Sequence, residues 1–267
     1  MAEFREMGVR RFGRVNWLGL QTLAEREVRR FLAVWTQTLM APLITAALFL
    51  AIFSLAIGTR RGEVMGVPFV EFLAPGILMM TVIQNAFANT SSAIMIAKVQ
   101  GNIVDTLMPP LSPAELVAGY LAGAVGRGLF VAAAVLAMAA LVLGQGVAHP
   151  VWVLVYVVLG SLFLGALGII AAILAQKFDQ MAAITNFIVT PLSFLSGTFY
   201  SVEDLPDFMW TLTHLNPVFY LIDGVRFGVI GTSDSSPWLG VPIVVASTAL
   251  AVAVCWRWFK SGYRMKA

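Results

Sequence analysis

The chain has 267 residues, of which 59% are hydrophobic and 12% are charged, and its mean hydropathy is +0.86. Because soluble domains carry about 25% charged residues, this composition excludes an ordinary soluble fold and favours an integral membrane protein. The formal net charge of +3 indicates little by itself. The single cysteine, Cys255, excludes an intramolecular disulfide, and the two histidines have no metal-binding spacing, so no metal site is expected. No nucleic-acid partner is expected either.

The first predicted element is an amphipathic helix over residues 15–32. Its apolar residues recur at spacings of three and four and define one helical face: Trp17, Leu20, Ala24, Val28, Phe31 and Trp35. Arg26 and Arg30 lie largely off this face, and Glu25 can pair with Arg29 four residues later. Such a helix is expected to lie in the membrane plane with its apolar face in the lipid. Two interpretations stay open, a simple anchor and a surface against which a cytoplasmic partner packs.

Six long apolar stretches take up most of the chain. A membrane-spanning helix needs about 20 apolar residues, and every stretch is long enough, the fifth only just. The predicted spans are Phe31–Ile57, Phe72–Ala97, Leu116–Leu143, Val151–Ala175, Met181–Phe199 and Leu239–Phe259. We therefore predict an all-α integral membrane fold with six transmembrane helices in one domain, residues 1–267.

Basic residues are distributed unevenly between the two sides that six spans define. One side holds Arg5, Arg10, Arg11, Arg14, Arg26, Arg29, Arg30, Lys98, Lys177, Arg257, Lys260, Arg264 and Lys266. The other side holds a few arginines against a larger group of acids: Arg60, Arg61 and Arg226, with Glu63, Glu71, Glu203, Asp204, Asp207, Asp223 and Asp234. Since cytoplasmic loops carry the excess of Lys and Arg, both termini are expected in the cytoplasm.

The loop after the second span, residues 98–112, is the one substantial cytoplasmic loop that the six spans leave between them. Gly101 and Asn102 can start a short helix, and Pro109 and Pro110 end it. An ordinary turn between helices would not need so many residues that start or end a helix.

The next helix has its own start signal. Ser112 can cap its N-terminus, with Pro113 at the first position and Glu115 at the third, which is a capping box. The sequence thus predicts a short helix held in a rigid cytoplasmic elbow, with Asp105 and Leu107 exposed on it.

Polar residues inside the predicted spans have two interpretations. Arg127 lies about twelve residues into the third span, at a depth of ~18 Å, where a charge costs ~2.5–3.5 kcal/mol on insertion scales. It either attracts an anionic head group or bonds helix-end carbonyls and snorkels. In the second span Thr81, Asn85, Asn89 and Ser92 share one face. They either line a substrate route or hold neighbouring helices together.

The segment 200–231 is too polar to span the membrane and too apolar for a free loop. Asn216-Pro217 breaks it into two short helices. Two helices that dip into the outer leaflet fit better than a seventh span, because Asp223 and Arg226 would be costly at the midplane. Their i, i+3 spacing predicts that these two pair with each other.

Two segments of the chain resemble the type 2 ABC exporter permeases, a family that contains nodulation-factor, polysaccharide and drug export permeases. In that family the tail typically runs Pro-Leu-x-Phe-x-Ser-Gly-x-Phe-(Phe/Tyr), then Leu-Pro, then Asn-Pro-x-x-(Tyr/His), then Asp-x-x-Arg. The matching residues are Pro191, Leu192, Phe194, Ser196, Gly197, Phe199, Tyr200, Leu205, Pro206, Asn216, Pro217, Tyr220, Asp223 and Arg226. The loop resembles the family's coupling region, Gly-(Thr/Asn)-x-x-x-Leu-x-x-x-Pro-(Leu/Ile)-Ser. It matches at Gly101, Asn102, Leu107, Leu111 and Ser112, with Pro110 offset by about one position.

This resemblance implies a half-transporter that works as a homodimer in the bacterial inner membrane. A separate cytoplasmic ABC ATPase subunit would dock on the coupling helix and on the amphipathic helix, through Glu25, Arg29, Gly101, Asn102, Asp105, Thr106 and Leu107. The chain contains no Gly-x-x-x-x-Gly-Lys-(Ser/Thr), so it is expected to bind no cofactor, with ATP and Mg on the partner. The implied substrate is amphiphilic, such as a lipid, glycolipid, lipid-linked glycan or drug.

Two rival functions make different demands on the sequence. An ion-coupled carrier would need inverted repeats and acidic residues at mid-membrane, and no Asp or Glu lies centrally in any predicted span. An intramembrane lipid-modifying enzyme would need clustered Asp, His or metal ligands near one interface, and none cluster in the sequence. The exporter permease is therefore the preferred hypothesis.

Overall fold

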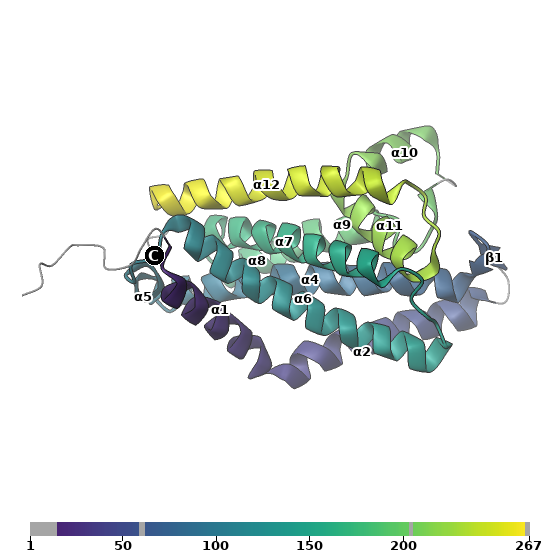
Figure 1. Cartoon of the computed structure of the whole chain (residues 1–267), viewed down its shortest axis with the longest axis horizontal. Helices are drawn as coiled ribbons and strands as arrows, with labels where there is room; N and C mark the ends of the chain where they lie inside the picture. The colour runs from purple at the N-terminus through teal and green to yellow at the C-terminus, as the bar shows by residue number, and fades with distance from the viewer. Residues whose placement is uncertain (1–14, 59–61, 203–204, 265–267) are drawn as a thin grey trace, which may run out of the picture.

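The computed structural model describes residues 15–58, 62–202 and 205–264, and these are almost entirely helical (Figure 1). The described part also contains one small hairpin that the sequence did not predict, in which β1 (Glu63–Val64) pairs antiparallel with β2 (Val67–Pro68). Several charged residues used to predict the orientation lie outside the described residues: Arg5, Arg10, Arg11, Arg14, Arg60, Arg61, Glu203, Asp204 and Lys266.

Five helices in the described ranges are long and apolar enough to cross a membrane. They are α2 (Trp35–Phe53, continued by the π-helix η1, Ser54–Gly58), α4 (Phe69–Val99), α6 (Pro113–Leu143), α7 (Pro150–Leu174) and α12 (Pro237–Ser261). In the most apolar stretches of α4 and α7, 78% and 67% of the residues are buried, against 28% or less in α2, α6 and α12. The helices α4 and α7 therefore form the centre of the bundle, and the other three present broad apolar faces outward.

Small residues bring the two central helices together. A Cβ added to Gly168 would lie 2.5 Å from the backbone oxygen of Phe87, so only glycine fits there. One turn earlier, the hydroxyl of Thr90 donates to the carbonyl of Gly165 at 2.7 Å. Lipid tails are as apolar as the helix surfaces, so close backbone approach and interhelical hydrogen bonds have to supply the packing energy.

The two ends of the bundle differ in what they carry. One end, called here the elbow end, holds the start of α1 (Trp17–Leu32), the short helix α5 (Ile103–Leu107) and the end of α12 (Figure 1). The opposite end, called here the hairpin end, holds β1–β2 and α10 (Asp207–His214). The first described helix therefore begins, and the last one ends, at the same end of the bundle.

The predicted fifth span, Met181–Phe199, is only partly helical. The helices α8 (Phe178–Ile184), η2 (Thr185–Val189) and α9 (Thr190–Phe194) follow one another without a break and have 7, 5 and 5 residues. At 1.5 Å per residue this run is roughly 25 Å long. The helix ends before the predicted boundary because the turn at Gly197 takes a left-handed conformation, φ +80°, that favours glycine.

The segment 200–231 forms two short helices, but they have different surroundings. The helix α10 lies at the surface with Phe208 75% exposed. The helix α11 (Pro217–Ile230) packs among α4, α7 and α12, and most of its residues are buried. The second helix thus enters the protein interior, which explains how this segment can carry charged side chains.

Those charges form a buried ionic cluster at the hairpin end. Arg226 is fully buried, and its Nη1 lies 3.6 Å from Asp223 Oδ1 and 3.1 Å from Asp234 Oδ2. Its Nη2 donates to the carbonyl of Gly197 at 2.5 Å, and the guanidinium carbon lies 4.2 Å from the centre of the Phe72 ring. The predicted pairing of Asp223 with Arg226 is confirmed, and Asp234, which the sequence did not single out, is the nearer carboxylate.

The Asn-Pro-x-x-Tyr motif closes the turn between α10 and α11. The Oδ1 atom of Asn216 accepts from the backbone N–H of Val218 at 3.0 Å, and its Nδ2 donates to the hydroxyl of Ser196 at 2.7 Å. The hydroxyl of Tyr220 donates to the carbonyl of His214 at 3.0 Å. These contacts tie the tail together within the protein, so the motif has a structural role.

Arg226→Met removes the cation from the cluster and leaves Asp223 and Asp234 buried without it. Breaking a buried pair in this way costs about 3–5 kcal/mol, so we expect a large drop in the melting temperature of the purified protein in detergent. The triple variant R226M/D223N/D234N should recover part of the loss. Arg29→Met, which removes an exposed arginine, is the control. A wild-type melting temperature for R226M would show that the cluster does not stabilise this end.

Candidate functional site

The predicted elbow between α4 and α6 is present in the structure. Gly101 adopts φ +72°, which turns the chain out of α4, and α5 begins directly after Asn102. At the start of α6 the backbone N–H of Glu115 donates to Ser112 Oγ at 3.4 Å, and the N–H of Ser112 donates to Glu115 Oε2 at 2.5 Å. The predicted capping box is confirmed.

The same carboxylate also fastens the N-terminal helix to the elbow. The backbone N–H of Asn16 donates to Glu115 Oε1 at 2.6 Å, and Asn16 Nδ2 donates to the carbonyl of Pro110 at 3.3 Å. Asn16 in turn caps α1 by accepting from the N–H of Gly19 at 3.0 Å. Because Asn16 and Glu115 are both buried, neither helix can leave without exposing or orphaning these groups.

The helix α1 runs obliquely to the long helices and packs against α6 (Figure 1). Its buried residues are Leu23, Glu27 and Phe31. A Cβ added to Gly119 would lie 2.5 Å from Leu23 Cδ2, and one added to Gly123 would lie 2.5 Å from Glu27 Cβ. The helix α1 therefore packs against α6 at this pair of glycines.

This contact face differs from the face expected to lie in lipid. Trp17 and Trp35 are 72% and 54% exposed, whereas Phe31 of the same predicted face is buried against the protein. One part of the apolar stripe of α1 is thus exposed at the surface, and the other part packs against α6. The centre of the contact carries Glu27, whose burial a hydrophobic pattern does not predict.

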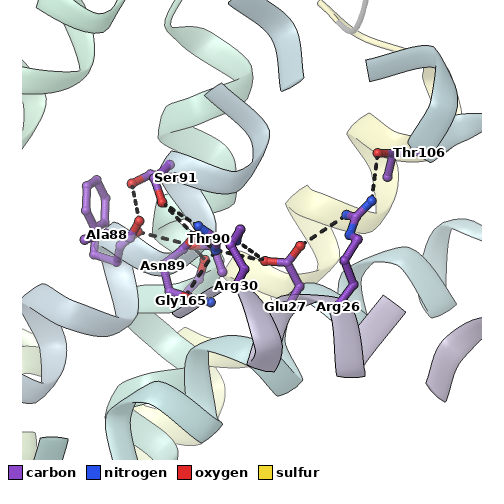
Figure 2. Close-up of polar contacts among 11 residues, drawn as sticks. Arg26, Glu27, Arg30, Ala88, Asn89, Thr90, Ser91, Thr106 and Gly165 are labelled. Atoms are coloured by element: carbon purple, nitrogen blue, oxygen red, sulfur yellow. Dashed lines mark hydrogen bonds and ion pairs between the residues drawn. The ribbon is translucent and has the colours of Figure 1, made fainter. Parts of the chain in front are cut away.

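Glu27 lies between two arginines, as Figure 2 shows, and is only 1% exposed. Arg26 Nη2 lies 3.1 Å from Glu27 Oε1, and Arg30 Nη2 lies 2.9 Å from Glu27 Oε2. Arg26 Nη1 also donates to the hydroxyl of Thr106 on α5 at 3.3 Å. Arg30 Nη2 donates to the carbonyl and to Oδ1 of Asn89 on α4, at 2.6 and 3.1 Å. One carboxylate therefore links the elbow helix to a central membrane helix.

The polar residues predicted to line a substrate path continue this network. Arg127 Nε donates to Asn85 Oδ1 at 3.1 Å, and Asn85 Nδ2 donates to the carbonyl of Thr81 at 2.9 Å. Asn85 and Asn89 are one turn apart on α4. The structure thus brings Arg127, Asn85 and Asn89 together, and these residues are called here the polar strip. The hydroxyl of Thr81 instead donates to the carbonyl of Leu78 within its own helix.

The residues expected to couple to a partner lie around α5 and on the outer side of α1. Asp105 and Leu107 are exposed on α5, and Thr106 faces inward to Arg26. Glu25 and Arg29 form the predicted exposed pair, with a distance of 2.5 Å between Oε1 and Nη2. The exposed apolar residues of this end include Val104, Leu107 and Met108.

A groove of about 470 Å³ separates α1 from α4 and α5. Arg26, Glu27 and Arg30 line its α1 side, and the apolar residues of α4 line the other. Its lining residues also include Arg29, Ala93, Ile96, Ala97, Gln100, Asn102, Asp105 and Thr106. The groove therefore has one charged wall and one apolar wall.

Sequence reasoning missed Asn16, Glu27 and Arg30 as members of this site, and it assigned Glu115 only a local capping role. A signal was present for Glu27, which lies four residues after Leu23 and four before Phe31, on the buried stripe of α1. A carboxylate on such a stripe with arginines on both sides indicates a buried ion pair.

Glu27→Gln keeps the shape of the side chain and removes its charge, so it leaves Arg26 and Arg30 without their shared counter-ion. We expect a lower melting temperature and faster amide hydrogen exchange throughout α1. Glu25→Gln is the matched control, because Glu25 makes an exposed pair on the same helix and such pairs contribute little. Unchanged exchange in E27Q would mean that the carboxylate does not hold α1 in place.

Comparison with known proteins identifies the family. The family model described as ABC-2 type transporter matches residues 19–230. The chain is 36% identical over 257 residues to the inner membrane transport permease YadH of Escherichia coli strain K12, which covers 94% of this chain and 98% of the relative. It is 28% identical over 217 residues to nodulation protein J of Sinorhizobium fredii strain NBRC 101917 / NGR234, covering 79% of this chain and 80% of that protein. The chain therefore belongs to the ABC-2 type transporter family, as the membrane-spanning permease subunit of a transporter.

Proposed function

We propose that the chain is the permease subunit of an ATP-driven exporter in the bacterial inner membrane. It works as a homodimer and receives its energy from a separate ABC ATPase subunit that docks at the elbow end. The observation that carries this proposal is the elbow itself, in which α1, α5 and the start of α6 share the contacts of Glu115 and Glu27. A connection between helices that transmits no movement from a partner would not need two buried carboxylates around it.

The surface of α5 supports the docking of a soluble partner. In α5 the apolar side chains of Val104 and Leu107 are 54% and 36% exposed, and that of Met108, which directly follows the helix, is 76% exposed. Asp105 and Arg29 flank these apolar side chains, beside the groove between α1 and α5. An apolar centre with a charged rim is the usual anatomy of a protein interface.

The distribution of charge supports a cytoplasmic elbow end. The described basic residues of this end are Arg26, Arg29, Arg30, Lys98, Lys177, Arg257, Lys260 and Arg264. At the hairpin end Arg226 is neutralised by Asp223 and Asp234. The excess of Lys and Arg lies on the cytoplasmic side of bacterial membrane proteins. Both termini are then cytoplasmic, with six crossings if the run α8–η2–α9 spans a locally thinned bilayer.

The polar strip supports a substrate with a polar head and an apolar body. Arg127, Asn85 and Asn89 lie on helices whose remaining surface is apolar. Within the described residues, the carboxylates of the five long helices are Glu71 and Glu115, each in the first turn of its helix. This leaves no acidic group at mid-membrane for ion coupling, so energy from a partner ATPase fits better than a carrier mechanism.

The purified chain alone is expected to hydrolyse no ATP, whereas the complex with its ATPase partner hydrolyses ATP and moves an amphiphile across a vesicle membrane. The reason is that the chain lacks a phosphate-binding loop. Co-purification followed by a phosphate-release assay on both preparations measures this. Robust, azide-insensitive hydrolysis by the single chain would overturn the proposal.

The double variant D105K/L107D is expected to lose the ATPase partner on co-purification while its melting temperature stays near that of the wild type. Both side chains are exposed on α5, so the change affects the docking surface and not the core. Asp207→Lys makes the same charge reversal in the exposed first turn of α10 at the opposite end, and it should keep the partner. Full partner yield and normal export in D105K/L107D would show that docking occurs elsewhere.

A further inference from the structure

The strip between α1, α4 and α6 carries more positive than negative charge. Glu27 is the one carboxylate bonded to it, and both Arg26 and Arg30 already use that group. Arg127 is half-buried, and in the described part of the chain its one hydrogen bond runs from Nε to Asn85. The two terminal nitrogens of Arg127, with four N–H donors between them, bond no described protein atom.

No other acid of the described chain is placed to balance this charge. Glu115 is engaged by Asn16 and Ser112 at the elbow. Asp105 lies at the mouth of the groove, exposed on α5. A half-buried guanidinium with free donors therefore calls for an anion from outside the protein.

Asn89 gives a second and independent sign of a missing acceptor. Its side chain is fully buried, and its Oδ1 accepts from Arg30 Nη2 at 3.1 Å. This bond fixes the orientation of the amide, because the flipped form would set an NH₂ group against the guanidinium. The Nδ2 atom then has no acceptor among the described residues. It faces Gly123, where an added Cβ would lie 3.0 Å from it. Gly123 is one turn before Arg127 on the same face of α6.

We propose that Arg30, Arg127 and Asn89 bind the phosphate-type anionic head group of an amphiphile. This inference rests on the proposed function, for which it names the substrate class. The free terminal nitrogens of Arg127 suit the oxygens of a phosphate, which accept bidentate hydrogen bonds. The nitrogens of Arg30 already donate to Glu27, Asn89 and Ser92, so this residue adds its positive charge and one remaining Nη1 N–H. Asn89 holds Arg30 through its Oδ1 and has the Nδ2 donor left over.

The geometry also supplies a route and a depth for such a head group. The groove beside Arg30 opens at the elbow end, near Asp105, and has an apolar wall on α4, formed by Ala93, Ile96 and Ala97, along which an amphiphile can enter. Arg127 lies one turn beyond Gly123, where Glu27 packs, and it is level with the end of α1, since a Cβ added to the neighbouring Gly126 would lie 3.7 Å from the Phe31 ring. Amphipathic helices of this kind lie at the head-group boundary, and the site therefore lies at the inner-leaflet head groups or just below them.

The test uses the full-length chain in complex with its ATPase partner, in nanodiscs of phosphatidylcholine with and without phosphatidylglycerol. Phosphatidylglycerol should raise the melting temperature of the wild type, and this shift should be lost in R30Q and in R127Q. Arg257→Gln is the matched control, since it removes the same charge from an exposed position of α12 outside the groove. R127K keeps the charge and removes the planar fork, so it should lose most of the shift even if R127Q folds poorly.

A second arm separates a lipid head group from a free anion. Inorganic phosphate added to the phosphatidylcholine nanodiscs should give little or no shift, because the remaining surface of α4 and α6 around these residues is apolar and favours an amphiphile over a free ion. An equal shift with inorganic phosphate would overturn the head-group assignment. So would a full phosphatidylglycerol shift in both R30Q and R127Q, or a loss in R257Q as large as theirs. Partner-dependent ATP hydrolysis, measured on the same samples, tests the proposed function separately from this site.

Discussion

The burial of one carboxylate, Glu27, determines how the elbow end is arranged. A charge removed from water is tolerated only when it is paired and hydrogen-bonded, and Glu27 is paired with Arg26 and Arg30 at about 3 Å. Those two arginines reach in opposite directions, to Thr106 on α5 and to Asn89 on α4. A displacement of α5 must therefore move the whole network or break it. This coupling of one small exposed helix to a central membrane helix is what an energy-receiving subunit requires.

The rest of the fold follows the same physical logic. Between helices surrounded by lipid the hydrophobic effect provides little attraction, so glycine contacts and polar clusters determine which faces meet. At the hairpin end Arg226 holds Asp223 and Asp234 around the carbonyl of Gly197. At the elbow end Glu27 and Glu115 do the equivalent. The two ionic clusters lie toward opposite ends of a largely apolar bundle, and Arg127 lies one turn inside the elbow-end cluster.

Much of this fold could be predicted from the sequence, because its signals are local. The long apolar stretches, the capping box at Ser112, the pair Glu25–Arg29 and the break at Asn216 each depend on residues close together in the chain. The predicted fifth span extended too far because Gly197 ends the helix through a backbone conformation that hydropathy does not encode. The six-span topology stays a proposal.

The candidate site was less predictable, because its contacts join distant segments. Glu115 was expected to cap its own helix, but its second oxygen binds Asn16, which is 99 residues away. Asp234 reaches Arg226 only because the chain turns back between α11 and α12. Glu27 looked like one more charge on an amphipathic helix. In each case a single sequence does not show which helix faces meet, and that pairing decides which charges become buried.

The central claim is that a partner ATPase engages the elbow end, and a photo-cross-linking amino acid tests it most directly. It would be placed at Met108, directly after α5, and, in a second protein, at Phe208 on α10, two positions with nearly equal exposure, 76% and 75%. The account predicts that illumination of membranes joins the ATPase to the chain from position 108 and not from position 208. A cross-link from position 208 with none from 108 would contradict it.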